Sequence, residues 1–203
     1  MIISVFWGNK AMKSINYNEK TKVFTLRTKN SMYQMQVVEY ETLVHLYYGA
    51  DIGDTEASHR IVCLDRGFSG NPYEAGADRT FSLDVLPQEY SGYGNGDYRI
   101  NGIEVGHEDG SDAVHLRYES YRTSKGKYSL EGLPCMFGTE DEAETLDITL
   151  YDRITDLKVH LLYGVFYDLD VITRAVRLEN KGEDTVTIQR AMSMEMDYTN
   201  KHM

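Results

Sequence analysis

The sequence predicts an all-β fold, a large antiparallel sandwich of two sheets (a supersandwich) with few or no helices. Apolar and polar residues alternate in many short segments that turn residues separate, and no segment has a convincing 3.6-residue period. The 16 tyrosines, together with Val, Ile and Thr, favour strands. A chain of 203 residues without an internal repeat or a low-complexity linker can bury a proper core, so we expect one domain.

The first part of the chain predicts three strands. Residues 1–11 have no clear pattern and are interpreted as an irregular terminal segment. Val23–Arg27 and Met32–Val38 alternate on either side of the turn Lys29–Ser31, which predicts a hairpin. A third strand is expected at Leu43–Tyr48.

Strand patterns return in the second half of the chain. They are Tyr98–Val105, Ala113–Arg122, Leu146–Leu150, Leu157–Phe166, Val171–Leu178 and Thr185–Met196. Asp109-Gly110 predicts a hairpin between the first two of these strands, and Asn180-Lys181-Gly182 predicts one between the last two. The final pattern continues almost to the end of the sequence, so we expect the segment to belong to a longer protein.

A long connection, Leu64–Arg99, separates the two sets of strands. It contains Pro72, Pro87 and many glycines, and within it only Phe81–Leu86 has the pattern of a short strand. Long connections with little secondary structure are usually functional or disordered, and this one is too rich in aromatic residues and paired charges for disorder. We therefore expect an ordered, exposed loop that meets a ligand or another domain.

The formal charge of −11 argues against nucleic acid and anionic membranes as partners, because both require basic surfaces. The start of the chain lacks the features of a signal peptide, and no apolar run reaches transmembrane length. Cys63 and Cys135 are expected to be reduced thiols in a cytoplasmic protein.

Motifs for metal, phosphate and nucleophilic chemistry are missing from the sequence. The six histidines lie far apart without H-x-x-x-H or C-x-x-C spacing, so we expect no metal site and no cofactor. Gly92, Gly94 and Gly96 form a flexible turn rather than a phosphate loop, because no Lys-Ser/Thr follows them. There is no G-x-S-x-G motif.

The composition of the long connection suits sugar binding. Carboxylates and arginines grip adjacent hydroxyl groups, and aromatic rings stack on the C–H faces of a pyranose. The charged candidates are Asp65, Arg66, Asp78, Arg79 and Asp97, interleaved with Phe68, Tyr73, Phe81, Tyr90 and Tyr93. Structural Asp–Arg ion pairs that hold the loop would explain the same pattern equally well.

A long series of segments from Met12 onward resembles the N-terminal domain of glycoside hydrolase family 36 α-galactosidases of the bacterial type. The segments, in family order, include NEKTKVFTLRTKNSMYQMQV, LVHLYYG, LDRGFSGNP, DRTFSLDVLPQEYSGYGNGDYR, LRYESYRTSKGKYSLEGLP, EAETLDITLYD, YDLDVITRAVRLENKG and IQRAMSMEMD. The sequence departs from the family pattern at Ser91, where proline is usual, and at Cys135 and Met136.

The resemblance implies an N-terminal extension at residues 1–11 and an N-terminal β-sandwich domain at residues 12–203. It further implies a retaining hydrolase of terminal α-galactosyl groups in melibiose- and raffinose-type sugars. In the family, both catalytic aspartates lie on a following (β/α)8 barrel that this segment lacks. We therefore expect no catalytic residue here, an inactive fragment when alone, and two partners: the protein's own catalytic domain and further copies in a homo-oligomer.

In the family, this connection reaches toward the galactose pocket. The matching positions are Asp65 in LDR and Arg79 in DRTFS, which would hydrogen-bond sugar hydroxyls or orient a pocket residue. Asp97 and Arg99 are interpreted as structural because they lie where the next strand begins. The alternative to a supporting domain of an α-galactosidase is a free-standing module for carbohydrate binding or oligomerisation.

Overall fold

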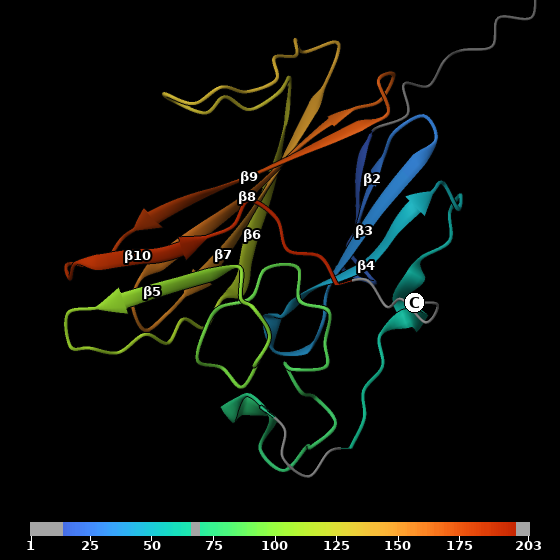
Figure 1. The fold of residues 1–203 in the computed structure, drawn as a ribbon. Coiled ribbons are helices and arrows are strands. Elements are labelled where there is room, and N and C mark those ends of the chain that lie inside the picture. Colours follow the sequence, from blue (N-terminus) through green and yellow to red (C-terminus); the bar gives the residue numbers. More distant parts are fainter. Residues whose placement is uncertain (1–13, 66–69, 198–203) are drawn as a thin grey trace, which may run out of the picture.

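The computed structural model describes residues 14–65 and 70–197. Its strands form three antiparallel sheets (Figure 1). The first sheet has the order β1-β2-β3-β4, the second β6-β7-β8-β9, and a two-stranded ribbon pairs β5 with β10. The strands are β1 Ile15–Asn18, β2 Val23–Arg27, β3 Ser31–Val37, β4 Leu43–Ala50, β5 Ile103–His107, β6 Arg117–Lys125, β7 Glu144–Asp152, β8 Leu157–Phe166, β9 Val171–Asn180 and β10 Val186–Ala191.

Helical structure in the described part of the chain is limited to three short 3-10 turns: η1 Glu39–Glu41, η2 Ala57–Arg60 and η3 Tyr73–Ala75. The expected all-β, antiparallel class is therefore confirmed. None of the helices in the described residues has the length and apolar character needed to cross a membrane.

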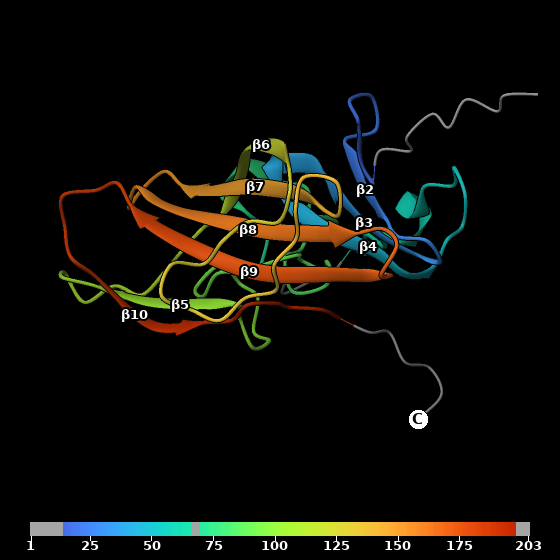
Figure 2. The same cartoon turned by 90° about the horizontal axis from the view of Figure 1, so that it is seen from above.

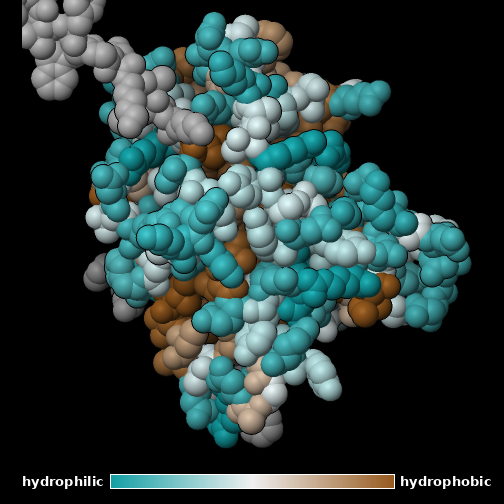
Figure 3. Space-filling model, turned by 180° about the vertical axis from the view of Figure 1, so that it is seen from behind, coloured by the Kyte–Doolittle hydropathy of each residue, from teal (hydrophilic) through white to brown (hydrophobic). Residues whose placement is uncertain are grey.

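The main core lies between the sheets. Alternate residues of β7 and β8, such as Leu146, Ile148 and Leu161, pack against Phe24 of β2 and Ile103 of β5. Because side chains alternate across a strand, the residues between them point to the opposite face of the β6–β9 sheet. Figure 2 shows β6–β9 side by side as one layer, with the β5–β10 ribbon on the β9 side. Seen from behind, the surface is mostly hydrophilic, with several smaller apolar areas between the polar side chains (Figure 3).

Most predicted strands are confirmed. The hairpin of the first half is present as β2 and β3, which pair antiparallel from Val23 opposite Gln36 to Arg27 opposite Met32. The bounds of β8 agree with the predicted Leu157–Phe166. The sequence did not predict β1, because a strand of four residues is too short to show a clear alternation.

The hairpin predicted at Asp109-Gly110 is wrong. The turn itself forms, since Gly110 N donates to His107 O at 3.0 Å and Gly110 has a φ of 84°. After the turn, however, Val114 is fully buried and its N–H donates to Tyr93 O at 2.9 Å. This contact diverts the chain into the long connection, so β5 pairs with β10 and β6 pairs with β7.

The hairpin predicted at Asn180-Lys181-Gly182 is also wrong. The turn packs against the neighbouring β7–β8 connection, where Lys181 N donates to Asp156 O at 2.9 Å. β9 therefore pairs with β8 alone, and the chain crosses to β5. Thr185 N donates to Glu108 Oε1 at 3.1 Å and starts the new pairing.

Three further expectations have different outcomes. Phe81–Leu86 is not a strand, because Val85 N and Leu86 N both donate to Ser82 O and close a turn. Cys63 and Cys135 are both free and exposed. The extension predicted at residues 1–11 lies outside the described residues, so the boundary at residue 12 stays a prediction.

Candidate functional site

The connection between β4 and β5 lies below both sheets and reaches from one to the other (Figure 1). Its described part is fixed by its own apolar residues. Phe81, Leu83 and Leu86 are buried against Val44 and Leu46 of β4 in a second apolar cluster. Burial of these side chains, at about 1.5–3 kcal/mol each, explains why a segment with so little regular structure is ordered.

Asp65 and Arg79 meet at the exposed end of this connection. Arg79 Nη2 lies 2.8 Å from Asp65 Oδ1, although the two residues are far apart in the loop sequence. Their side chains stay 65% and 58% exposed. An exposed pair of this kind contributes only about 0–1 kcal/mol to stability. The geometry therefore leaves most of both polar groups available to a partner outside this chain.

Asp78 shapes the backbone beside Arg79. Its carboxylate accepts hydrogen bonds from Thr80 N at 2.8 Å and Thr80 Oγ1 at 2.7 Å. These hydrogen bonds from Thr80 lower the pKa of Asp78. Of the five charged candidates, Asp78 therefore forms a turn, while Arg66 lies outside the described residues, as does Phe68 among the aromatic ones.

Asp97 and Arg99 hold the base of the connection. Arg99 Nη2 lies 2.7 Å from Asp97 Oδ2 and donates to the carbonyls of Leu86 at 2.7 Å and Leu83 at 3.0 Å. Gln88 Nε2 donates to the same Asp97 oxygen at 2.8 Å. These contacts are structural, as expected for this pair.

Residues near the end of the described chain, Met192 and Glu195, also contact the base of this connection. Ser91 N donates to Glu195 Oε2 at 2.8 Å across 104 residues of sequence, and Tyr90 donates its hydroxyl to Met192 O at 2.9 Å. Burial raises the pKa of Glu195, and the negative charge of Asp197 adds to the rise, although hydrogen bonds from Ser91 oppose it. Ser91 therefore ties the connection to the last described residues of the chain.

A buried charged cluster anchors the connection to both large sheets. Glu89 is fully buried, and it accepts hydrogen bonds from Tyr33 of β3 at 2.8 Å and from Tyr163 of β8 at 2.7 Å. Arg174 of β9 donates to it through Nη1, and His45 Nδ1 of β4 lies 3.6 Å away. We call these five residues the Glu89 cluster.

The Glu89 cluster stabilises opposite charges out of contact with water. Burial alone would raise the pKa of Glu89, but the positive charge of Arg174 and the hydrogen bonds around the carboxylate hold it below its ordinary value. Burial raises the pKa of Tyr33 and Tyr163 well above the ordinary value, so both hydroxyls stay donors. The Arg174 guanidinium also stacks 4.5 Å from the centre of the Tyr163 ring.

Sequence reasoning missed the Glu89 cluster, although one signal was present. Arg174 shares a strand face with Ile172, Val176 and Leu178, so it interrupts an otherwise apolar row. A charged residue in such a row requires a buried partner. The partner could not be identified from the sequence, because Glu89 comes from a loop 85 residues away.

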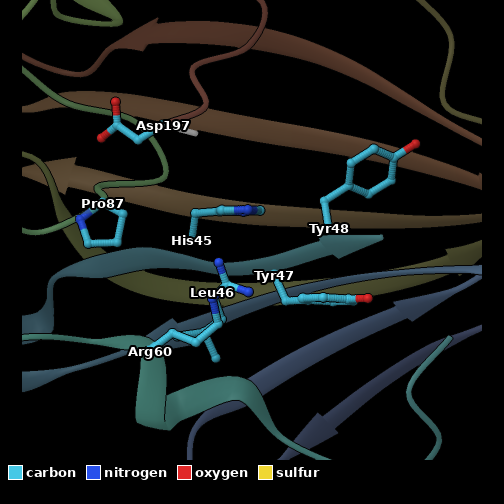
Figure 4. A pocket seen from close by; sticks show the side chains of 7 residues that line it. All are labelled: His45, Leu46, Tyr47, Tyr48, Arg60, Pro87 and Asp197. Atoms are coloured by element: carbon cyan, nitrogen blue, oxygen red, sulfur yellow. The ribbon is translucent and has the colours of Figure 1, made fainter. Parts of the chain in front are cut away.

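A small hollow lies beside the Glu89 cluster. It is lined by His45, Tyr47 and Tyr48 of β4 and by Arg60 and Asp197 of other segments (Figure 4). Its volume of about 120 Å³ is below the roughly 300 Å³ at which ligand pockets usually begin. This hollow is therefore too small for a sugar ring with its hydroxyl groups.

Metal binding has no support in this part of the chain either. Within the described residues, no group of three or more His, Cys, Asp or Glu side chains is placed to hold a metal ion.

Comparison with known proteins identifies the family. Residues 41–203 match the model of the glycosyl hydrolase family 36 N-terminal domain. The chain belongs to this family. The bifunctional α-galactosidase/sucrose kinase AgaSK of Mediterraneibacter gnavus is 46% identical over 185 residues, which are 91% of this chain and 20% of AgaSK. The resemblance noted from the sequence is thereby confirmed.

Solved structures of family 36 enzymes have the same fold. The galactosidase domain of AgaSK has a TM-score of 0.86 at 47% identity, over 89% of this chain and 25% of that one. A variant of the α-galactosidase AgaA from Geobacillus stearothermophilus, in complex with raffinose, has a TM-score of 0.83 at 43% identity. That match covers 88% of this chain and 25% of AgaA. The chain therefore spans about a quarter or less of these relatives.

Proposed function

We propose that this segment is the non-catalytic N-terminal domain of an α-galactosidase that hydrolyses terminal α-galactosyl residues of melibiose- and raffinose-type oligosaccharides. The family match and the short span relative to AgaSK support this function. Variants of AgaA are known in complex with raffinose and with stachyose, which supports an α-galactoside as the substrate. The catalytic aspartates would come from a barrel outside this segment.

Asp65 and Arg79 are the residues that we propose to complete the sugar pocket. The observation that carries this role is their exposed 2.8 Å pair on an otherwise well-anchored loop. Galactose hydroxyls both donate and accept hydrogen bonds, so an acid and a guanidinium held together suit adjacent hydroxyls. Each residue would bind hydroxyls or orient a pocket side chain rather than break the glycosidic bond.

Several exposed apolar side chains on the same connection support a partner domain or subunit. The most exposed of them is Tyr73, at 97%. The others are Val62, Leu64, Tyr93, Tyr98 and Ile100. Exposed patches of this composition mark sites of protein contact. We propose that the protein's own barrel and a second copy in a homo-oligomer cover this surface, and that the enzyme is cytoplasmic.

Substitution of Arg79 in the longer enzyme tests this function. Arg79→Ala should lower kcat/KM for raffinose. The loss of transition-state stabilisation should be about 1–3 kcal/mol, the scale for a charged hydrogen-bond partner. Arg153→Ala is the matched control, because Arg153 also forms an exposed ion pair, with Glu41. Unchanged kcat/KM together with an altered oligomer would assign Arg79 to assembly instead. Measurable hydrolysis of p-nitrophenyl α-galactoside by the 203-residue chain alone would contradict the non-catalytic assignment.

A further inference from the structure

The face of the β6–β9 sheet opposite the core carries polar side chains on all four strands. The register aligns Arg122, Asp147, Leu162 and Ala175 in one row. The next row on this face is Ser120, Thr149, His160 and Arg177. Their neighbours along the strands, such as Leu146 and Leu161, line the core, so period two turns these two rows away from it.

Two hollows lie on this outer face, with volumes of about 350 and 310 Å³. Both are lined by Arg122 and Arg177, which makes them neighbours in one groove. Their size is in the range of small-molecule sites, about 300–1,000 Å³. Thr149 of β7 lines the first hollow with His160, and Thr145 lines the second with Asp147 and Leu162.

The centre of the groove is an ordered network around Asp147. This carboxylate is only 4% exposed, and it accepts hydrogen bonds from Arg122 Nε at 3.0 Å and His160 Nδ1 at 3.0 Å. Burial opposes its charge, but the hydrogen bond from His160 and the charge of Arg122 lower the pKa of Asp147 below its ordinary value. His160 Nε2 in turn faces Glu179 Oε2 at 3.5 Å. The network therefore presents fixed charges rather than mobile ones.

The same geometry excludes two other kinds of site. A catalytic triad needs the hydroxyl and the carboxylate on opposite ring nitrogens, but Thr149 Oγ1 lies 3.3 Å from His160 Nδ1, the nitrogen that Asp147 already contacts. A metal ligand needs a free ring nitrogen, and both nitrogens of His160 face carboxylates. Nucleic acid is also a poor match, because acidic side chains balance the basic ones along the groove.

We propose that this groove binds a neutral oligosaccharide. Hydroxyl groups donate and accept, so a sugar requires donors and acceptors side by side. Arg122 and Arg177 supply donors, since their side chains are 70% and 52% exposed. Glu179 supplies an acceptor at one end. Tyr128 lines the other end, and because Lys127 Nζ covers one face of its ring, only the opposite face is left for the C–H face of a pyranose. This site is separate from Asp65 and Arg79 and does not depend on their proposed role.

Titration of the 203-residue chain with stachyose tests the groove, with calorimetry for affinity and NMR shifts for location. The wild-type chain should bind at millimolar affinity, with shifts confined to β6–β9 and to Tyr128 and Ser129 beside them. Arg177→Ala should weaken binding by about tenfold, a loss of roughly 1.4 kcal/mol. This variant should fold normally, because Arg177 contacts Asp147 only at 3.8 Å; its thermal unfolding verifies this. Arg153→Ala, outside both hollows, should bind like the wild type.

Three results would contradict the proposal that the groove binds an oligosaccharide. The first is the absence of saturable binding by the wild-type chain at tens of millimolar stachyose. The second is equal binding by the folded Arg177→Ala variant. The third is binding that Asp65→Ala abolishes, which would place the sugar at the loop. Unchanged kcat/KM of Arg79→Ala in the longer enzyme would contradict the proposed role of Arg79 but would not affect this titration. The two proposals can therefore be rejected independently.

Discussion

Two of the acid–arginine pairs that involve the connection between β4 and β5 differ chiefly in burial. Asp65 and Arg79 meet at its exposed end, whereas Glu89 meets Arg174 with almost no access to solvent. The chemistry of the two pairs is the same. The exposed pair leaves its polar atoms for an outside partner, and the buried pair fixes the path of the loop against β3, β4, β8 and β9. Burial, rather than residue type, therefore assigns the role.

The first prediction breaks the buried pair. Arg174→Ala should lower the free energy of unfolding of the 203-residue chain by about 3–5 kcal/mol, because it leaves the Glu89 carboxylate buried without its counter-charge. Urea unfolding followed by circular dichroism measures the change. An effect below about 1 kcal/mol would show that the pair contributes no more than a surface ion pair.

The second prediction concerns how the stability of the chain depends on pH through Glu89 of the same pair. The pKa of Glu89 is lower in the folded chain than its ordinary value of 4.5, so its stabilising contribution is present above that value and is lost as the pH falls through the folded pKa. Below about pH 4.5 the wild-type chain should lose stability more steeply than the double variant Glu89→Gln, Arg174→Met. That variant removes both charges and keeps most of the volume. Parallel curves of urea midpoint against pH would contradict this assignment.

The third prediction removes one hydrogen bond from the Glu89 cluster. Tyr163→Phe deletes the donor that lies 2.7 Å from Glu89 and should cost about 1.5–3 kcal/mol of unfolding free energy. Tyr47→Phe is the matched control, since Tyr47 gives its hydroxyl to Ala50 O in an exposed position, and it should change stability by less than about 0.5 kcal/mol. Equal effects of the two substitutions would remove the distinction between buried and exposed donors.

The fourth prediction concerns the exposed pair and has the smallest effect. Arg79→Ala in the 203-residue chain should change the free energy of unfolding by less than about 0.5 kcal/mol, because its pair with Asp65 is screened by solvent. The same urea titration measures it. A loss of several kcal/mol would mean that the pair holds the loop, which was the alternative interpretation of these charges.

Local patterns predicted most of the strands and the β2–β3 hairpin, but they failed at the other two predicted hairpins. The alternation in Leu157–Phe166 is long and bounded by turns, so its bounds agree with β8. The turn residues at Gly110 and Gly182 also form turns, but partners distant in sequence decide where the chain goes next. After the first turn, Val114 N–H donates a hydrogen bond to Tyr93 O, and after the second, Thr185 N–H donates one to Glu108 Oε1. A turn signal reports backbone conformation, whereas the sheet that a strand joins depends on contacts that no local pattern contains.

The candidate site shows the same division. The charged, aromatic composition of Leu64–Arg99 indicated a loop with a role in recognition, and the structure brings Asp65 and Arg79 together within it. Glu89 had no distinguishing pattern in the sequence, because its importance comes from burial by side chains of four strands. The groove on β6–β9 was hidden for the same reason, since strand register alone places Arg122 beside Asp147.

The contact between Ser91 and Glu195 has a consequence for the order of synthesis. The two residues are 104 positions apart, and Tyr90 likewise depends on the carbonyl of Met192. During translation, the connection emerges from the ribosome long before the residues that close its base. The base of the connection can therefore reach its final geometry only after residue 195 has left the ribosome, when all the residues of β6–β9 have already been synthesised.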